Sequence, residues 1–200
     1  MMAQTLLDLA FKGKRDYLHG TDVLNQTLFW LQDALPGAPL EDIDFSFHHL
    51  AHHQVGVRIG ASPAGQSVYS VCAFTQGGRR EKAYLIETDM PVTRRYPYPE
   101  EEIVAPMQID SAVRRGVLLG TVEYTDIEVW VAMTKALHHA VFPQAPSKWL
   151  FVRGRFPNYT RRTQARERTL AIAASLRNRL TRSEAFLDGR KVGEIFFSLA

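Results

Sequence analysis

Two stretches of the chain decide the expected fold: TDVLNQTLFWLQDALPGAP at residues 21–39 and TDIEVWVAMTKALHHAVFPQAP at residues 125–146. Each begins with Thr-Asp, continues with apolar residues at helical spacing and closes on Ala-Pro. The opening pairs lie 104 residues apart and the closing pairs 107 apart, a growth that a short loop insertion would produce. Gly78-Arg79 and Gly189-Arg190 recur at an offset of 111. The constant order indicates an internal repeat.

Strand-like segments surround each helical stretch in the same order. They lie at residues 10–18, 43–50, 55–62 and 67–88 in the first half, and at 117–124, 148–156, 170–178 and 180–200 in the second. The helical stretches have little polar face, so we expect two buried helices, near residues 24–35 and 127–141. One buried helix wrapped by an antiparallel sheet is the hot-dog arrangement.

We therefore expect an α+β protein that forms a double hot dog, with two buried central helices wrapped by a continuous antiparallel sheet. The first unit would span residues 1–88 and the second residues 112–200. Residues 89–111 hold four prolines and three consecutive glutamates, a composition typical of a linker. The alternative is a single α+β domain in which the matches between the halves arose by chance.

Composition narrows the class of protein. The apolar fraction of 46% and the charged fraction of 22% are ordinary for a globular protein and exclude a disordered or fibrous chain. Cys72 is the single cysteine, which excludes an internal disulfide and a cysteine-based zinc site. No apolar stretch approaches the roughly 18 residues that span a bilayer, and the N-terminal charges follow the apolar residues, the reverse of a signal peptide. We expect a cytoplasmic protein without a membrane span.

Residues 16–35, DYLHGTDVLNQTLFWLQDAL, carry a resemblance to a known family. They resemble the active-site segment of the bacterial β-hydroxyacyl-acyl-carrier-protein dehydratases, in which a His before the central helix is followed fourteen positions later by an Asp or Glu. His19 and Asp33 have this spacing, and EDIDFSFHHLAHHQVGVRI at residues 41–59 looks like the family's second and third strands. The resemblance implies that His19 and Asp33 are the catalytic pair.

The activity implied by this resemblance is dehydration of 3-hydroxyacyl chains carried on acyl carrier protein or coenzyme A. Dehydration needs a base for the C2 proton and an acid for the departing hydroxyl, roles that a His and a carboxylate can fill. Glu123 and Leu137 occupy the aligned positions of the second half, so only the first half is expected to be catalytic. Two alternatives remain open: a hot-dog acyl thioesterase, and a non-catalytic module that binds an acyl carrier.

The chain departs from the family at two places. His19 is followed by Gly-Thr-Asp instead of Phe-Pro-Gly, and Thr27-Leu28 replaces the family's Pro-Gly, whose glycine N–H would help to stabilise an enolate. If the helix starts at Asp22, Asp33 lies about 16 Å along its axis. A start near Thr27 would instead let His19 and Asp33 converge.

Two further residues of the first helical stretch are candidates for substrate binding. Asp22 recurs as Asp126 at the start of the second stretch, as helix capping demands. Hot-dog thioesterases, however, use a carboxylate near the helix to activate water, so Asp22 is also a candidate for that role. Asn25 is a candidate for orienting a substrate carbonyl, with a structural role as the alternative.

The histidines of HHLAHH at residues 48–53 and of the pair 138–139 raise a metal hypothesis. Neighbours on a strand face opposite sides and no carboxylate stands at a supporting spacing, so we expect no metal. His52 and His53 are instead expected to border the substrate site. No glycine-rich phosphate loop or nucleotide fingerprint is present, and we expect no cofactor.

The last quarter of the chain is basic, because residues 151–200 carry 11 Lys/Arg against 4 Asp/Glu. Such a surface favours an anionic partner, although a solvated face is the alternative. Acyl carrier proteins are acidic, so the resemblance implies carrier binding through Arg153, Arg155, Arg161 and Arg162. Single-stranded RNA is less favoured, since the arginines run across separate segments without a recognised motif. Association into a homodimer stays open, although a double hot dog already makes internally the contact that single hot dogs make by dimerising.

Overall fold

The computed structural model describes residues 3–200, and the contacts between its elements divide the chain into two units. Unit 1 extends to Tyr98 and includes Pro157–Tyr159, whereas unit 2 contains Pro99–Phe156 and Thr160–Ala200. The boundary after Tyr98 falls within residues 89–111, the segment expected to be a linker. Within the described residues, no helix is long and apolar enough to cross a membrane.

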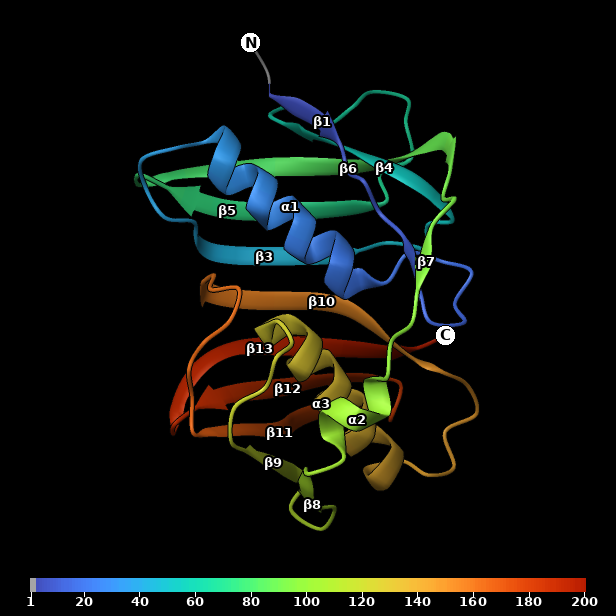
Figure 1. Ribbon diagram of the computed structural model, residues 1–200, viewed down its shortest axis with the longest axis vertical. Helices are drawn as coiled ribbons and strands as arrows, with labels where there is room; N and C mark the ends of the chain where they lie inside the picture. The colour runs from blue at the N-terminus through green and yellow to red at the C-terminus, as the bar shows by residue number, and fades with distance from the viewer. Residues whose placement is uncertain (1–2) are drawn as a thin grey trace. The chain divides into compact units, whose positions relative to one another are not determined.

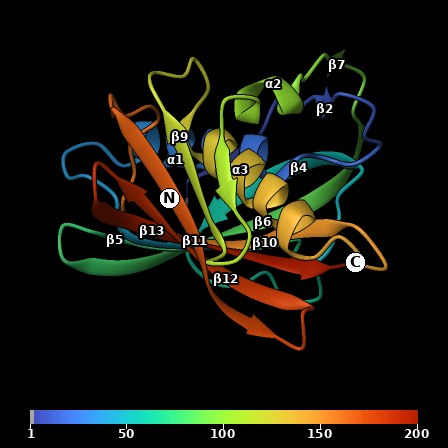
Figure 2. The same cartoon turned by 90° about the horizontal axis from the view of Figure 1, so that it is seen from below.

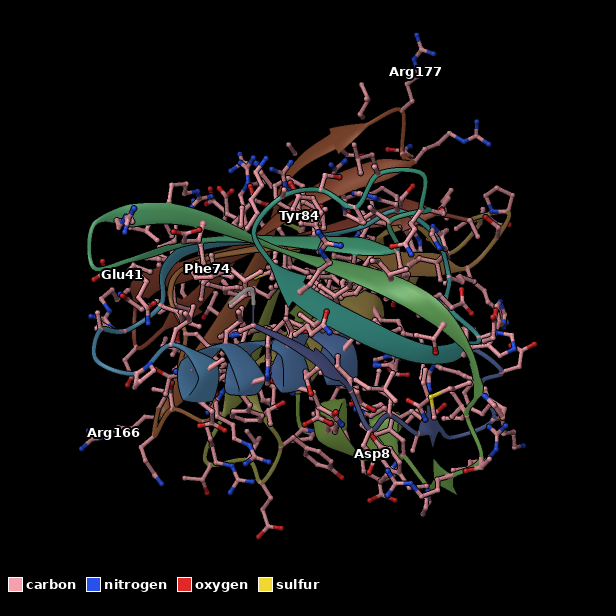
Figure 3. The ribbon with its side chains drawn as sticks, turned by 90° about the horizontal axis from the view of Figure 1, so that it is seen from above. Asp8, Glu41, Phe74, Tyr84, Arg166 and Arg177 are labelled. Carbon is pink, nitrogen blue, oxygen red and sulfur yellow. The ribbon has the colours of Figure 1, made fainter. Side chains whose placement is uncertain are left out.

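Unit 1 combines one helix with an antiparallel sheet. Its elements are β1 (Gln4–Leu6), β2 (Phe11–Lys12), α1 (Gly20–Ala34), β3 (Glu41–Phe47), β4 (His53–Ile59), β5 (Ser70–Gln76), β6 (Arg79–Pro91) and β7 (Arg95–Tyr96). The sheet has the order β1-β4-β6-β5-β3, with antiparallel neighbours throughout. β2 and β7 form a separate parallel pair. Figures 1 and 3 both show α1 against one face of this sheet.

The apolar spacing of α1 explains its burial. Leu24, Leu28 and Leu31 recur at intervals of four and three residues, and together with Val23 they are completely buried. The helix ends at Ala34, two residues before Pro36, which cannot continue it. α1 begins at Gly20, four residues before the expected start, and this difference decides the geometry of the candidate site.

Unit 2 combines a longer helix with antiparallel strands. Its elements are α2 (Glu100–Val104), β8 (Gln108–Asp110), β9 (Arg115–Leu119), α3 (Asp126–Val141), β10 (Trp149–Asn158), β11 (Glu167–Leu176), β12 (Leu180–Leu187) and β13 (Arg190–Leu199). The sheet order is β10-β13-β12-β11-β9-β8. α3 packs against β9, β11 and β13, and α2 packs against α3 (Figure 2).

Most predicted elements lie close to their expected ranges, with exceptions in the two segments that precede the helices. The strand expected at residues 117–124 is β9, which already ends at Leu119. The segment at residues 10–18 was expected to be a strand, but only Phe11 and Lys12 form one. Gly13 follows with a φ of 62°, a left-handed conformation that ends the extended run. Residues 13–19 form a loop that leads into α1. Residues 89–111, which were expected to be a linker, contain the short elements β7, α2 and β8.

Candidate active site at the start of helix α1

His19 and Asp33 lie at opposite ends of α1. His19 is the N-cap residue and is buried, whereas Asp33 lies in the last turn and is exposed. Fourteen residues of α-helix place them about 20 Å apart along the axis. The spacing brings such a pair together only where the helix starts well after the histidine, and here it starts at the next residue. The two groups therefore do not meet on one substrate atom.

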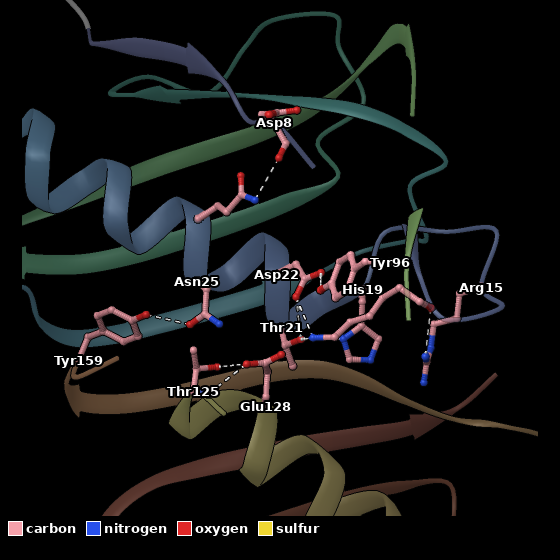
Figure 4. Close-up of polar contacts among 12 residues, drawn as sticks. Asp8, Arg15, His19, Thr21, Asp22, Asn25, Tyr96, Thr125, Glu128 and Tyr159 are labelled. Atoms are coloured by element: carbon pink, nitrogen blue, oxygen red, sulfur yellow. Dashed lines mark hydrogen bonds and ion pairs between the residues drawn. The ribbon is translucent and has the colours of Figure 1, made fainter. Parts of the chain in front are cut away.

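The start of α1 instead gathers a different set of groups around His19. The Nζ of Lys12 donates to Thr21 Oγ1 at 3.1 Å and to Asp22 Oδ1 at 2.9 Å. The hydroxyl of Tyr96 donates to Asp22 Oδ2 at 2.5 Å, and His19 Nδ1 lies 2.7 Å from Thr21 Oγ1. Figure 4 shows Asp22 between Tyr96 and Thr21, with His19 beside them.

Lys12 and Tyr96 were missed by sequence reasoning. They come from β2 and β7, which are far apart in the sequence and pair in parallel with Lys12 opposite Tyr96. Lys12 is completely buried, and its Nζ lies 4.0 Å from the centroid of the Tyr98 ring. A buried ammonium is tolerated only where a carboxylate and other acceptors compensate its lost hydration. Asp22, Thr21 and the face of Tyr98 supply that compensation.

The hydrogen bonds of Thr21 indicate which nitrogen of His19 is basic. Thr21 Oγ1 accepts from Lys12, and its own hydrogen can point to Asp22 Oδ1 at 3.4 Å. His19 Nδ1–H then donates to Thr21, and every group in the chain of bonds is satisfied. The opposite tautomer would give up the bond from Thr21 to Asp22. Within this set of bonds, the hydrogen of His19 is therefore placed on Nδ1 and the lone pair on Nε2.

The end of the helix adds positive electrostatic potential beside this imidazole. The side chain of His19 makes no cap hydrogen bond to the helix, and its carbonyl accepts from the N–H groups of Asp22 and Val23. The N–H groups of Gly20 and Thr21 precede these bonds, where a helix carries its unsatisfied donors and partial positive charge. Gly20 has no side chain to screen them. The family resemblance implies a glycine N–H at the position of Thr27-Leu28. In this chain the glycine at the start of the helix is Gly20.

Asn25 lies one helical turn after Thr21 on the same face of α1. It is buried, and its Oδ1 accepts a hydrogen bond of 2.8 Å from the hydroxyl of Tyr159. Tyr159 also meets the ring of Phe29 edge-on. The structure thus brings Asn25, Asp22 and His19 to the first two turns of one helix.

His52 and His53 lie elsewhere in unit 1, at the start of β4, and both are exposed. Their backbone N–H groups donate to Glu87 Oε1 at 2.7 and 2.8 Å, and His53 Nδ1 lies 3.1 Å from the same oxygen. Burial raises the pKa of Glu87, but these hydrogen bonds outweigh it and the net pKa is lowered. The two histidines thus fix Glu87 and are not part of the cluster around His19. Among residues 3–200, no His, Cys, Asp and Glu side chains gather as a metal site.

The four arginines expected to bind a carrier form two groups in unit 2. Arg153 and Arg155 lie on β10, with their guanidinium carbons 5.8 and 5.5 Å from the ring centroid of Phe196. Arg161 and Arg162 lie in the loop before β11, where the Arg161 carbonyl accepts the N–H of Asp126 and the Arg162 side chain donates to a backbone carbonyl. Two of the four arginines therefore lie on a strand, and the other two lie in a loop that contacts the residues at the start of α3.

The start of α3 has a different set of groups. Thr125 is the N-cap residue, and Glu128 Oε2 accepts from its N–H at 3.0 Å and its hydroxyl at 2.7 Å. Asp126 accepts from the N–H of Thr163 at 3.1 Å and from its hydroxyl at 2.5 Å. The buried Arg168 lies 3.5 Å from the same carboxylate. This end of α3 carries no imidazole.

Comparison with known proteins identifies the fold. No protein-family model and no curated protein sequence matches the chain. A TesB protein from Mycobacterium avium subspecies paratuberculosis superposes with a TM-score of 0.58 at 10% identity, over 98% of this chain and 93% of that one.

Two further solved structures match the whole of this chain. The dehydratase domain of PpsC from Mycobacterium tuberculosis, in complex with C12:1-CoA, has a TM-score of 0.54 at 10% identity and is covered over 93% of its length. An acyl-ACP thioesterase from Bacteroides thetaiotaomicron has a TM-score of 0.51 at 11% identity and is covered over 98%. The neighbours are hot-dog proteins and include both polyketide synthase dehydratase domains and thioesterases. This chain has the hot-dog fold.

Proposed function

We propose that the protein acts on acyl thioesters and hydrolyses them at the start of α1. In this proposal each unit is one hot dog, the chain is a double hot dog, and unit 1 is the catalytic half. The observation that carries the proposal is the position of His19, whose basic Nε2 accompanies the positive end of a buried helix. The neighbours described as a C12:1-CoA complex and an acyl-ACP thioesterase support a fatty acyl chain on coenzyme A or acyl carrier protein as substrate.

The chemistry assigns one task to each group. His19 Nε2 takes a proton from water as the water oxygen attacks the thioester carbonyl carbon. The N–H groups of Gly20 and Thr21 stabilise the oxyanion that forms on the carbonyl oxygen. The carbon–sulfur bond then breaks, and His19 returns the proton to the departing thiolate. The products are a carboxylic acid and a free thiol, and Asp22 acts through Thr21 as a positioning residue.

Hydrolysis is favoured over dehydration because it needs only one acid/base group and an oxyanion site. Dehydration needs an acid and a base at two atoms of the substrate, and the expected partner Asp33 is about 20 Å from His19 along the helix. Dehydration remains the second candidate, supported by the family resemblance around His19 and by the dehydratase domains among the structural neighbours. In that reaction His19 would remove the C2 proton, and an acid other than His19 would protonate the departing hydroxyl.

The test follows both products in the same reaction. The protein is incubated with dodecanoyl-CoA and with 3-hydroxydodecanoyl-CoA, and free thiol and enoyl absorbance are measured together. We expect thiol from both substrates, and a loss of about 10²- to 10⁴-fold in His19→Ala. His139→Ala, which removes an exposed histidine in the last turn of α3, should keep full activity. Enoyl product without thiol would establish dehydration, and the absence of both products would leave the binding module.

A further inference from the structure

Within residues 3–200, three β-turns have positive φ at both central residues. Gly77-Gly78 joins β5 to β6 with φ of 54° and 76°, and Asp188-Gly189 joins β12 to β13 with φ of 47° and 79°. These are sequences that this type of turn favours, because glycine and aspartate tolerate left-handed backbone. The third turn, between β11 and β12, has Arg177 at 49° and Asn178 at 51°. Arginine at positive φ is strained, so Arg177 lowers the stability of this turn relative to glycine or asparagine at the same position.

The side chains around this turn combine two exposed leucines with two exposed arginines. We call Ser175–Leu180 the leucine-arginine tip. Leu176 and Leu180 are opposite one another in the ladder and are 63% and 40% exposed. The Arg177 and Arg179 guanidinium groups make no hydrogen bond or ion pair with residues 3–200. Figure 3 shows Arg177 at the free end of the hairpin, pointing away from the strands.

The other two turns share the charge of the leucine-arginine tip but lack its apolar component. Arg79 follows the first and Arg190 the second, and both are exposed. The residues that precede these turns are the polar Gln76 and the buried Leu187. An aliphatic pair beside unpaired arginines therefore distinguishes the leucine-arginine tip from turns of the same backbone type.

We propose that the leucine-arginine tip docks the protein onto an anionic lipid bilayer. Two leucines can enter the acyl boundary while Arg177 and Arg179 contact anionic headgroups, and a hydrophobic insertion combined with basic charge strengthens membrane binding beyond either alone. A stable protein interface takes about 800 Å² on each partner, more than a six-residue tip presents. A bilayer requires only the inserted side chains and the charge. This proposal does not depend on the thioester chemistry.

The experiment measures sedimentation of the full chain with lipid vesicles. We expect binding to vesicles of phosphatidylcholine mixed with phosphatidylserine, weakening as salt is raised, and little binding to phosphatidylcholine alone. Leu176→Ser with Leu180→Ser should lower the partition coefficient about tenfold or more, and so should Arg177→Ser with Arg179→Ser. The matched control, Arg79→Ser with Arg190→Ser, removes the same charge at the other two turns and should stay within about twofold of the parent protein.

A second variant separates binding from folding. Arg177→Asn with Asn178→Gly introduces the sequence that this turn type favours, so it should raise the melting temperature by about 2–4 °C. It also removes one cation from the tip and should weaken vesicle binding about fivefold. The proposal is overturned if the parent protein stays in solution with the mixed vesicles, or if the control variant loses as much binding as the tip variants. It is also overturned if the tip variants lose binding to an acidic acyl carrier protein but keep binding to vesicles.

Discussion

The starts of α1 and α3 both pair an aspartate with a buried cation, but the cation is a different residue in each. Each has an aspartate in the first turn beside a buried cation, at 2.9 Å in the pair Lys12 and Asp22 and at 3.5 Å in the pair Arg168 and Asp126. An acidic residue at this position is favourable because the N-terminus of a helix is positive. The repeated Thr-Asp sequence thus places a negative charge at the positive N-terminus of each buried helix.

The two ends differ in the groups that surround the aspartate. Around Asp126 the donors are the guanidinium of Arg168 and the amide and hydroxyl of Thr163. Around Asp22 they are the amine of Lys12 and the phenol of Tyr96, with the imidazole of His19 one hydroxyl away. The difference teaches that a repeat can keep the electrostatics of a helix end while the residues around that end change.

The largest effect should come from removing each carboxylate's charge. Asp126→Asn leaves the guanidinium of Arg168 buried without its counterion, and we expect it to lower the free energy of unfolding by about 3–5 kcal/mol. Asp22→Asn should cost less, because the Thr21 hydroxyl and the ring of Tyr98 still face the Lys12 ammonium. Urea denaturation measures both variants, and equal penalties would contradict the distinction between the two ends.

The next effect concerns the far ends of the two helices. The end of α3 buries His138, whose Nδ1 lies 2.6 Å from the Thr134 carbonyl and whose Nε2 lies 2.6 Å from the Thr181 hydroxyl. The end of α1 has the apolar Leu31 there. Burial lowers the pKa of His138 to about 4, helped by the nearby His139 and opposed by the hydrogen bond to Thr134.

The sign of the His138 effect follows from proton binding. The unfolded chain binds a proton at this histidine below a pH of about 6.5, while the folded protein stays neutral down to about 4. Stability should therefore be complete above pH 6.5 and fall by roughly 3 kcal/mol as the pH drops through this window. Urea denaturation across that range should show a slope that His138→Gln reduces. An unchanged slope in the variant would assign the acid sensitivity to other groups.

The sequence identified the features of the two helix ends that depend on local pattern. The apolar spacing predicted both helices, and the Thr-Asp repeat located Asp22 and Asp126, because helix burial and capping involve residues close in sequence. His19 was singled out by the family resemblance of the residues around it. Lys12 and Tyr96 were not, because a parallel pairing of two-residue strands brings them together and no periodic pattern marks such short strands.

The placement of Asp33 shows how one boundary controls a site. The predicted convergence of His19 and Asp33 required a helix start near Thr27, and the observed start is Gly20. Seven additional helical residues are nearly two turns, which moves Asp33 from the second turn to the last. The spacing of fourteen residues was correctly observed, but spacing alone does not determine a distance in space.

A smaller effect should follow from breaking the bond chain at α1. Thr21→Val keeps the volume of the side chain but removes the hydroxyl that joins His19 to Asp22 and Lys12. If this hydroxyl sets the tautomer of His19, kcat for thioester hydrolysis should fall about tenfold, as expected for roughly 1.4 kcal/mol, while KM stays unchanged. Thr21→Ser should restore kcat. A Ser variant as slow as the Val variant would indicate a packing role instead.

The smallest effect should come from the threonine that caps α3. Thr125→Ala removes the hydroxyl that donates to Glu128 Oε2 at 2.7 Å, and the loss of such a cap costs about 1 kcal/mol of unfolding free energy. Thr125→Ser retains the hydroxyl and should recover most of that stability in urea denaturation. Because His19, the proposed acid/base group, lies at the start of α1, hydrolysis by both variants should stay within about twofold of the parent protein. A large loss of kcat in Thr125→Ala with its stability intact would place the start of α3 in the reaction and end the proposed division of roles.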